Sequence, residues 1–236
     1  MEKCFCFIPA KSNSERLKNK NNLLLNGQPL YYYPIKCAVK SKLFDSEDII
    51  FSSDSEQMNR NAAAYGANVP YVRPENLTEN NIGIVHVLLD FLEQRPKYKE
   101  YEYAFISLPT APLTRPLDYI KSLNTIKREK SNTLLSISKN SNSIFQSMSI
   151  EKGLLKPVFE KSFLSKKVNS AYDTYHPNGC VHIIRIDKLI SEGSYVINPI
   201  SAYEMESNYG VDIDTESDFN YAQYLIKNNL IDFSWI

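Results

Sequence analysis

Two groups of charged side chains in this chain have residue types and spacings that could do chemistry. A polar segment directly after a buried apolar run carries Lys11, Arg16 and Lys20, and cationic side chains of this kind hold phosphate and other anions. Asp212 and Asp214 stand two residues apart, so an extended backbone puts both carboxylates on one face. Two such carboxylates, completed by phosphate oxygens and water, can bind a hard cation such as Mg2+ or Mn2+. The sequence therefore predicts an anion-binding loop and a metal site.

Each group alone also has a plain structural explanation. The basic segment could be a solvated loop, and Asp214 with Thr215 could cap a C-terminal helix while Asp212 is merely exposed. The chain contains neither GxGxxG nor GxxxxGKS/T, so it lacks the glycine-rich phosphate loops of dinucleotide-binding and Walker-type proteins. Any phosphate would therefore be held by basic side chains and by backbone amides of the loop.

The elements that must position these residues alternate between strands and helices. We expect strands at 4–8, 48–52, 69–72, 103–108, 133–138, 179–186 and, at an edge, 203–205. We expect helices at 29–42, 81–93, 116–129 and 187–192, a helix from a Ser53 or Asp54 cap to 65, and a last helix that ends near 228. Pro34 means that the first helix either bends or begins near Tyr33. This alternation indicates a parallel sheet with helices on both faces.

Three polar segments, 11–20, 53–54 and 109–113, each follow a predicted strand directly. The carboxyl ends of parallel strands meet at one edge of a sheet, and ligands bind there. We therefore expect these segments to converge on one site. The stretch 175–179 is predicted to be a turn that delivers further side chains to the start of the next strand.

The block 140–175 interrupts the alternation of strands and helices. Segments 146–150 and 154–159 alternate around a turn at 151–153, which is typical of a hairpin. We expect one domain, 1–236, with this block inserted as a lid or as an arm that packs on another subunit.

The charge balance and the apolar runs exclude several classes of protein. Lys+Arg and Asp+Glu are both 27, which gives a net charge of zero and argues against binding nucleic acid by bulk electrostatics. No apolar run approaches the roughly 20 residues that span a bilayer, and the N-terminus shows no signal-peptide pattern. We therefore expect a cytoplasmic protein that does not associate with a membrane.

The motifs resemble, in order and spacing, those of the acylneuraminate cytidylyltransferase (CMP-sialic acid synthetase-like) family. The resemblance covers essentially the whole chain and rests on 8–11, Ser14, Arg16, 20–21, 52–55, 73–74 with Leu77, 109–113, 177–179, 212–215 and 218–219. Three positions and one short segment differ from the family pattern. The segment is 79–81, which reads Glu-Asn-Asn where the family has a segment that contains aspartate. Lys11 and His176 stand where the family has arginine, and Leu108 stands where it has glutamine.

The resemblance implies an α/β fold, with a three-layer, Rossmann-like, mostly parallel sheet of the nucleotide-diphospho-sugar transferase type. It also implies a homodimer formed through a dimerisation arm at 140–175. The implied reaction joins CTP to a nonulosonic, sialic-acid-like 2-keto-3-deoxy sugar acid, with release of a CMP-sugar and pyrophosphate. Mg2+ or Mn2+ would be the cofactor.

The resemblance also assigns roles to individual residues. The implied catalytic residues are Lys11, Arg16, Lys20 and Asp212, and the implied metal ligands are Asp212 and Asp214. Nucleotide contacts would come from Ala10, Lys11, Ser14, Arg16, Lys20, Asn21, Arg73, Leu108 and Thr110. Sugar contacts would come from Tyr175, His176, Asn178 and Gly179.

Two other functions fit the same residues. A metal-dependent glycosyltransferase also uses an Asp-x-Asp pair, but it consumes a preformed nucleotide sugar and releases no pyrophosphate. A catalytically silent nucleotide- or sugar-binding homologue would bind ligand without turnover.

Overall fold

The fold is described from a computed structural model. The structure describes residues 3–14, 17–79, 82–141, 144–160 and 173–236. Its centre is a six-stranded sheet in the order β10-β6-β9-β5-β1-β4. The strands are β1 (Cys4–Pro9), β4 (Ile49–Ser52), β5 (Tyr103–Ile106), β6 (Thr133–Lys139), β9 (Tyr175–Arg185) and β10 (Ile200–Glu204). Strand β9 runs antiparallel to both of its neighbours, and every other pairing in the sheet is parallel.

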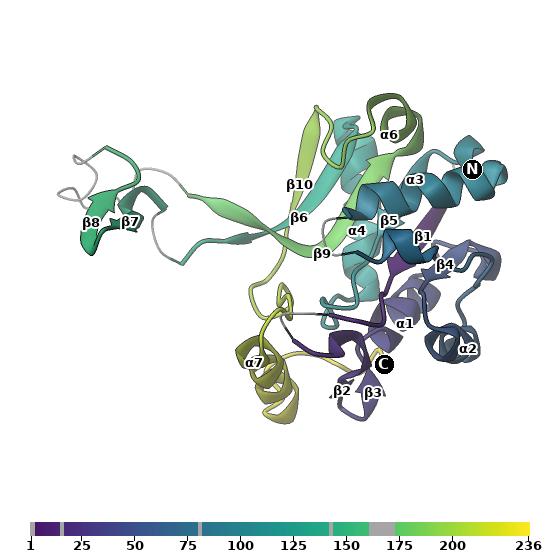
Figure 1. Cartoon of the computed structure of the whole chain (residues 1–236), viewed down its shortest axis with the longest axis horizontal. Helices are drawn as coiled ribbons and strands as arrows, with labels where there is room; N and C mark the ends of the chain where they lie inside the picture. Colours follow the sequence, from purple (N-terminus) through teal and green to yellow (C-terminus); the bar gives the residue numbers. More distant parts are fainter. Residues whose placement is uncertain (1–2, 15–16, 80–81, 142–143, 161–172) are drawn as a thin grey trace.

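Helices cover both faces of this sheet (Figure 1). They are α1 (Tyr32–Ser41), α2 (Glu56–Tyr65), α3 (Ile84–Gln94), α4 (Pro116–Glu129), α6 (Ile186–Glu192) and α7 (Glu216–Lys227). Short 3-10 helices are η1 (Lys20–Asn22), η2 (Ser46–Asp48), η3 (Glu75–Leu77), η4 (Pro96–Glu100) and η5 (Ile144–Gln146). A small hairpin of β2 (Leu24–Leu25) and β3 (Gln28–Pro29) lies beside α7 (Figure 1).

Strand β1 shows how the sheet separates two hydrophobic cores. Its side chains point alternately to the two faces, as the period of a strand requires. Cys6 and Ile8 belong to the core that α1, α2 and α4 cover, whereas Phe5 and Phe7 pack among residues of α3, η4 and α6. The predicted three-layer α/β fold with a mostly parallel sheet is therefore confirmed.

Several local predictions need correction. Residues 69–72 form no strand. The chain makes an isolated bridge just before them, between Asn68 and Ile50 of β4. Helix α2 is capped by Ser55, whose hydroxyl accepts from the Met58 amide, and not by Ser53 or Asp54. The stretch 175–179 is the beginning of β9 and not a turn. Pro34 lies in the first turn of α1, where a proline removes no helical hydrogen bond.

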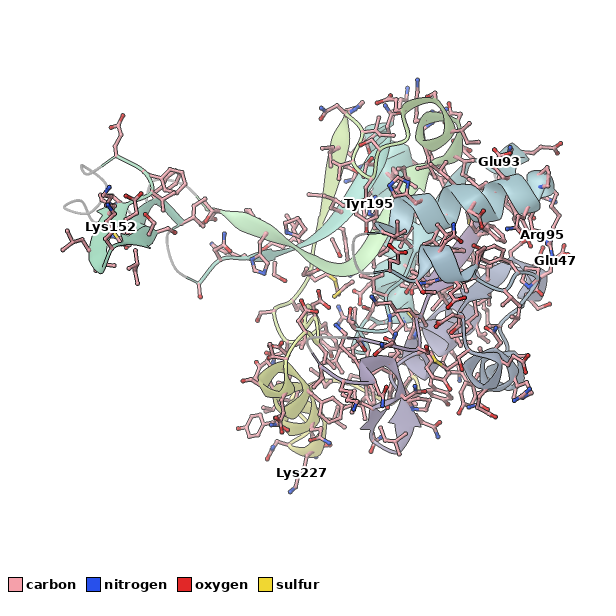
Figure 2. All side chains as sticks on the ribbon, viewed as in Figure 1. Glu47, Glu93, Arg95, Lys152, Tyr195 and Lys227 are labelled. Atoms are coloured by element: carbon pink, nitrogen blue, oxygen red, sulfur yellow. The ribbon has the colours of Figure 1, made fainter. Side chains whose placement is uncertain are left out.

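The inserted block protrudes from the sheet as an arm (Figure 1). Strands β6 and β9 lead into it, and the antiparallel hairpin of β7 (Met148–Glu151) and β8 (Leu154–Pro157) lies at its far end. Lys152 and Gly153 make the tight turn with φ of 50° and 81°, as a two-residue hairpin loop requires; Lys152 marks the tip in Figure 2. The predicted hairpin is confirmed, while residues 161–172 of the block lie outside the described residues.

Two further findings concern membrane-spanning helices and disulfide bonds. No helix in the described part of the chain has the length and apolar character that crossing a bilayer demands. The four cysteines, Cys4, Cys6, Cys37 and Cys180, are buried and unpaired.

His182 on β9 gives the fold a measurable pH dependence. It is 3% exposed, and its ring packs edge-on against Tyr195 with the centroids 3.8 Å apart; Tyr195 is labelled in Figure 2. Burial lowers the pKa of His182 to about 3. An unfolded histidine takes up a proton near pH 6.5. The contribution of the neutral ring is therefore fully present above that pH and is lost as the pH falls toward the folded pKa.

We expect the wild type to lose stability between pH 7 and pH 5 by about 2 kcal/mol more than His182→Phe does. Urea denaturation of both proteins at a series of pH values measures this difference. His86→Phe, at an exposed histidine of α3, is the matched control and should follow the wild type. Parallel pH dependences for the wild type and His182→Phe would contradict the assignment.

Candidate active site

The carboxyl ends of β1, β4 and β5 meet at one edge of the sheet. Because β9 is antiparallel to β5, with Ile106 opposite His182, the first half of β9 extends past the end of β5 at this same edge. The segments that follow these strands surround a cleft of about 480 Å³. Its lining includes nine of the predicted site residues: Lys11, Ser14, Lys20, Asn21, Arg73, Leu108, Thr110, Asp212 and Asp214. Two of the three strand-end segments expected to converge, 11–20 and 109–113, contribute to this lining. The third, 53–54, is not part of the lining, but its Asp54 contacts the loop at Ser12.

The basic loop is held in place by hydrogen bonds to its backbone. Asp54, which follows β4, accepts both from the Ser12 amide at 2.7 Å and from the Ser12 hydroxyl at 2.6 Å. The Asn21 side-chain amide donates to the carbonyl of Lys11 at 2.8 Å. The Ser14 hydroxyl accepts from the Lys20 amide at 2.9 Å. A loop fixed at these points pays little conformational entropy when it orders around a ligand.

Two further predicted residues of this loop are not among the nine. Ala10 is fully buried, and its amide donates to the Ser52 carbonyl at 2.9 Å, so it forms the floor where the loop leaves β1. Arg16 lies outside the described residues. Lys11 and Lys20 are the predicted loop cations whose place in the cleft wall the structure describes.

The aspartate pair has the alternation expected of an extended segment. Ile213 is completely buried, while Asp212 and Asp214 line the cleft on the opposite face. The Ile213 amide donates to the carbonyl of Thr110 at 2.7 Å, which joins the pair to the segment after β5. Both explanations of this sequence hold in part, because Thr215 caps α7 through its hydroxyl and the two carboxylates nevertheless face the cleft.

Lys20 and Asp214 form an ion pair across the cleft, with Nζ and Oδ1 2.7 Å apart. The lysine side chain is 13% exposed and the aspartate side chain is 44% exposed, so part of the attraction is screened by solvent. The sequence assigned these two residues to different ligands, one to phosphate and one to metal. Their pairing places the predicted phosphate-binding loop and the predicted metal ligands in direct contact.

Asp212 presents a partly unsatisfied carboxylate to the cleft. Its Oδ1 is buried and has no hydrogen-bond partner among the described residues. Burial raises the pKa of this carboxyl, while its hydrogen bond with Thr110 acts in the opposite direction. A buried carboxylate oxygen without a partner is costly, and a divalent cation removes that cost. The donor set therefore fits a hard metal ion held by Asp212 and Asp214 together with ligand oxygens.

Arg73 is a wall of the cleft that also supports the fold. It is 7% exposed, and its guanidinium donates to the carbonyl of Ser52 at 2.9 Å. Burial lowers the pKa of this guanidinium, an effect that the Asp54 charge opposes. The guanidinium of Arg73 thus hydrogen-bonds to Ser52 at the end of β4.

The four predicted sugar-binding residues do not lie together. Tyr175 and His176 are exposed on the part of β9 that leads into the arm, and His176 Nδ1 is 2.7 Å from Asn140 Oδ1; neither lines the cleft. Asn178 is 3% exposed and its amide points into the sheet, where it bonds Ser138. Gly179 alone approaches the aspartate pair, since a Cβ built on it would lie 3.0 Å from Asp212 Oδ2.

Comparison with known proteins agrees with this geometry. The sequence profile of the family described as Cytidylyltransferase matches residues 5–233. The match takes in the basic loop, the proline-rich segment after β5 and both aspartates. The chain belongs to the cytidylyltransferase family. The resemblance seen in the sequence motifs is therefore confirmed.

Relatives with assigned names include several cytidylyltransferases. A CMP-N,N'-diacetyllegionaminic acid synthase of Legionella pneumophila is 30% identical over 94% of this chain and 95% of its own length. A pseudaminic acid cytidylyltransferase of Campylobacter jejuni is 26% identical over 96% of this chain and 97% of its own. An N-acylneuraminate cytidylyltransferase of Escherichia coli is 30% identical over 93% of this chain. This chain spans about half of that longer relative, 51%.

Solved structures of the same architecture include two cytidyl-transferring enzymes. CMP:2-keto-3-deoxy-manno-octonic acid synthetase, complexed with CTP, superposes with a TM-score of 0.70 at 14% identity, covering 96% of this chain and 99% of that one. A 4-diphosphocytidyl-2C-methyl-D-erythritol synthase from Anaerococcus prevotii has a TM-score of 0.61 at 12% identity, over 94% and 98% of the two chains. At these identities the likeness shows that the fold is shared.

One side of the cleft was not predicted from the sequence. This side is mainly apolar and is built by Leu77, Ile82, Ile84 and Val87, together with Glu79. Its sequence signal was the resemblance to the family at 73–74 with Leu77. Ile84 and Val87 lie at the start of α3, whose apolar residues have the same periodicity whether they face the core or a ligand.

Proposed function

We propose that this cytidylyltransferase activates a nonulosonic 2-keto-3-deoxy sugar acid with CTP, forming a CMP-sugar and pyrophosphate. The observation that carries the proposal is the shared cleft, in which the basic loop meets the unsatisfied carboxylate of Asp212. A triphosphate with a divalent cation would place negative charge beside the cations of the loop and positive charge beside Asp212. The names of the relatives support an acid of the sialic, legionaminic or pseudaminic type.

The predicted site residues would have the following roles. Lys11, Arg16 and Lys20 would hold the triphosphate, on a loop that Asp54 fixes in place. Ala10, Leu108 and Thr110 would border the nucleoside, and Asp212 with Asp214 would hold the metal. When bound, Mg2+ or Mn2+ would neutralise charge on the phosphates during transfer.

The transfer itself is a substitution at phosphorus. The anomeric hydroxyl of the sugar acid forms a bond to the α-phosphorus of CTP, the bond from that phosphorus to the bridging oxygen breaks, and pyrophosphate leaves. The hydroxyl proton passes to solvent or to a base that the described residues do not single out. Reactions of this type are accelerated mainly by positioning and by stabilisation of charge, which matches a cleft built from fixed cations.

Pyrophosphate release tests this function directly. The purified protein is incubated with Mg2+ and each of CTP, UTP, ATP and GTP, against a panel of sialic, legionaminic and pseudaminic acids. We expect release with CTP and one class of acid, and none without the acid. Turnover of a preformed nucleotide sugar without pyrophosphate would indicate a glycosyltransferase, and binding without turnover a silent homologue.

We further propose that the arm forms a homodimer. Its hairpin exposes large apolar side chains, with Ile150 74%, Leu154 70% and Leu155 64% exposed. An isolated two-stranded hairpin is marginally stable, so a second copy that covers these side chains would stabilise it. Because Tyr175 and His176 lie on the arm and not in their own cleft, a sugar-binding role for them requires that second copy.

Leu154→Glu is expected to convert a dimer into monomers, because it places a charge in the apolar surface of the arm. Light scattering coupled to gel filtration measures the mass. Leu117→Glu, at a 48% exposed leucine on α4, is the matched control and should keep the dimer. A wild type that runs as a monomer at micromolar concentration would exclude the arm as a stable interface.

A further inference from the structure

Strand β9 contains a bulge at the point where it passes the cleft. Its pairing with β6 shifts register between Leu135 and Ile137, which lie opposite His182 and Pro177. The extra residues on β9 include Gly179, whose φ is +70°. Bulges of this kind redirect the backbone and are common beside active sites.

The side chain of Asn178 fills this bulge with hydrogen bonds. Its Oδ1 accepts from the Ser136 hydroxyl at 2.5 Å and from the Cys180 amide at 3.2 Å. Its Nδ2 donates to the Ser138 hydroxyl at 2.9 Å. Asn178 is 3% exposed, and both ends of its side-chain amide hydrogen-bond to other protein groups.

The same amide touches the segment that carries the aspartate pair. A Cβ built on Gly210 would lie 2.8 Å from Asn178 Nδ2 and would overlap the hydroxyl of Ser138. Only glycine permits so close an approach of backbone to these two side chains. Gly210 therefore rests directly on the Asn178 network, two residues before Asp212.

Asp212 is then confined from the other side by the bulge itself. A Cβ on Gly179 would lie 3.0 Å from Asp212 Oδ2, so the carboxylate packs against the bulged backbone. The Thr110 carbonyl fixes the next residue by accepting from the Ile213 amide at 2.7 Å. Two glycines and one buried asparagine thus determine where the Asp212 carboxylate stands.

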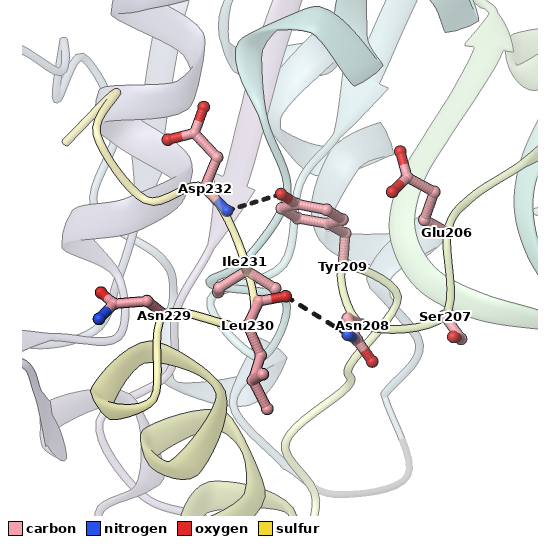
Figure 3. A pocket seen from close by; sticks show the side chains of 8 residues that line it. All are labelled: Glu206, Ser207, Asn208, Tyr209, Asn229, Leu230, Ile231 and Asp232. Carbon is pink, nitrogen blue, oxygen red and sulfur yellow. Dashed lines mark hydrogen bonds between the residues drawn. The ribbon is translucent and has the colours of Figure 1, made fainter.

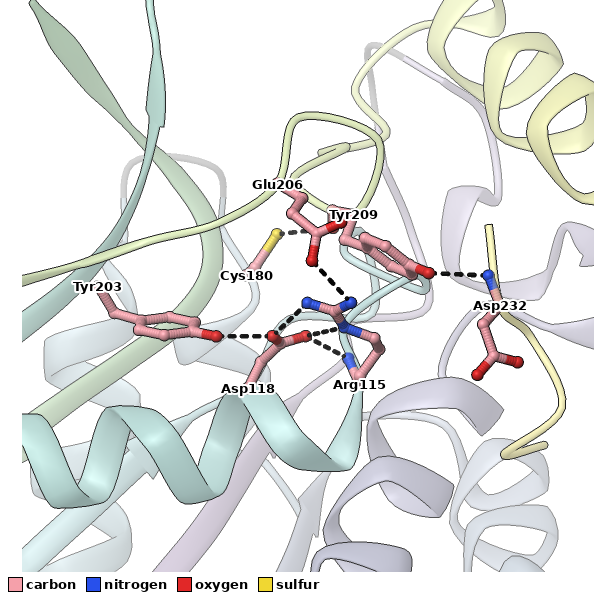
Figure 4. A network of polar contacts seen from close by, with 7 residues as sticks. All are labelled: Arg115, Asp118, Cys180, Tyr203, Glu206, Tyr209 and Asp232. Atoms are coloured by element: carbon pink, nitrogen blue, oxygen red, sulfur yellow. Dashed lines mark hydrogen bonds and ion pairs between the residues drawn. The ribbon is translucent and has the colours of Figure 1, made fainter. Parts of the chain in front are cut away.

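The beginning of this segment has its own anchors. Arg115 pairs with Glu206 at 3.1 Å, and its guanidinium stacks 3.8 Å from the centre of the Tyr209 ring (Figure 4). The hydroxyl of Tyr209 accepts from the Asp232 amide at 2.7 Å, on the wall of the hollow that Figure 3 shows. Residues 206–214 are therefore fixed at the start by Arg115, in the middle by Asn178 and at the end by Thr110.

We infer that Asn178 is a positioning residue for Asp212 and not a contact for the sugar. By filling the bulge it fixes Gly179 and Gly210, and these fix the carboxylate that receives the metal. The inference rests on the proposed function insofar as Asp212 binds a divalent cation.

Binding of Mn2+ alone, followed by electron paramagnetic resonance, tests this role without turnover. We expect Asn178→Ala and Gly210→Ala each to weaken Mn2+ binding at least tenfold. At saturating metal, the KM for the sugar acid should change less than threefold. Gly83→Ala, which adds the same methyl group where no atom lies within 4 Å, is the matched control and should bind Mn2+ as the wild type does. Ser138→Ala combined with Gly210→Ala removes the overlapping hydroxyl and should restore part of the affinity.

The outcomes separate the roles. Unchanged Mn2+ affinity with a tenfold higher KM for the sugar acid in Asn178→Ala would overturn the inference and make the amide a sugar contact. If Asn178→Ala does not fold by circular dichroism, Gly210→Ala and its Ser138→Ala rescue decide the question. If Asp212→Ala binds Mn2+ as tightly as the wild type, the metal assignment of the proposed function fails, independently of Asn178.

Discussion

Replacing Asp212 with alanine is expected to lower the kcat for CTP turnover at least about a hundredfold, ~2.7 kcal/mol in the barrier, while the protein stays folded. Its Oδ1 is buried without a hydrogen-bond partner among the described residues, so the variant loses the proposed cation ligand and no hydrogen bond from that atom. Burial raises the pKa of this carboxyl, which means that the folded state already disfavours its charge. The variant should therefore melt close to the wild-type temperature.

Steady-state pyrophosphate release and a thermal melt check both halves of this prediction. Asp45→Ala, at an exposed aspartate that is not part of the cleft lining, is the matched control and should retain wild-type rates. If Asp212→Ala releases pyrophosphate at the normal rate, the assignment of Asp212 as a metal ligand is wrong. A protein that fails to fold would show that the carboxylate is structural.

Replacing Lys20 with alanine is expected to cost at least tenfold in kcat/KM for CTP, about 1.4 kcal/mol. The ammonium group faces the cleft from a side chain that is only 13% exposed, where charge-assisted bonds to phosphate are worth more than at a solvated surface. The change also removes the ion pair between Lys20 and Asp214, so the dependence on metal concentration should shift together with that on CTP.

Kinetics at several CTP and Mg2+ concentrations measure this effect. Lys18→Ala provides the matched control, because Lys18 lies on the same loop but is exposed. Equal losses in Lys18→Ala and Lys20→Ala would indicate a general effect of charge on the loop. No loss in Lys20→Ala would exclude this lysine from the phosphate site.

The fold could be predicted in most of its elements because its signals are local. Apolar runs, the Gly66 stop after α2 and the Lys152-Gly153 turn each specify their element from a few neighbouring residues. The strand expected at 69–72 was wrong. Its composition is typical of a strand, but the bridge to β4 is made by the preceding residue, Asn68. Pairing depends on tertiary neighbours that a short apolar run does not encode.

Most of the residues expected to hold the nucleotide line one cleft, since they follow strand ends that a parallel sheet brings together. The residues expected to hold the sugar are not among that lining. Asn178 follows a proline and precedes a glycine, which is typical of an exposed turn. In the structure it lies at the bulge of the antiparallel strand β9, and its amide points toward Ser136 of β6. Whether a side chain at a bulge faces the ligand or the sheet depends on the neighbouring strand, and Ser136 and Ser138 determine it here.

The fate of the phosphates of CTP tests directly whether this cleft catalyses nucleotidyl transfer. The protein is incubated with Mg2+, a nonulosonic acid from the panel and CTP labelled with 32P at either the α or the γ position, and the products are separated. We expect α label to appear in a CMP-sugar and γ label in pyrophosphate, in equal amounts. Label that stays in CTP for every acid of the panel, or γ label released as orthophosphate, would contradict nucleotidyl transfer by this cleft.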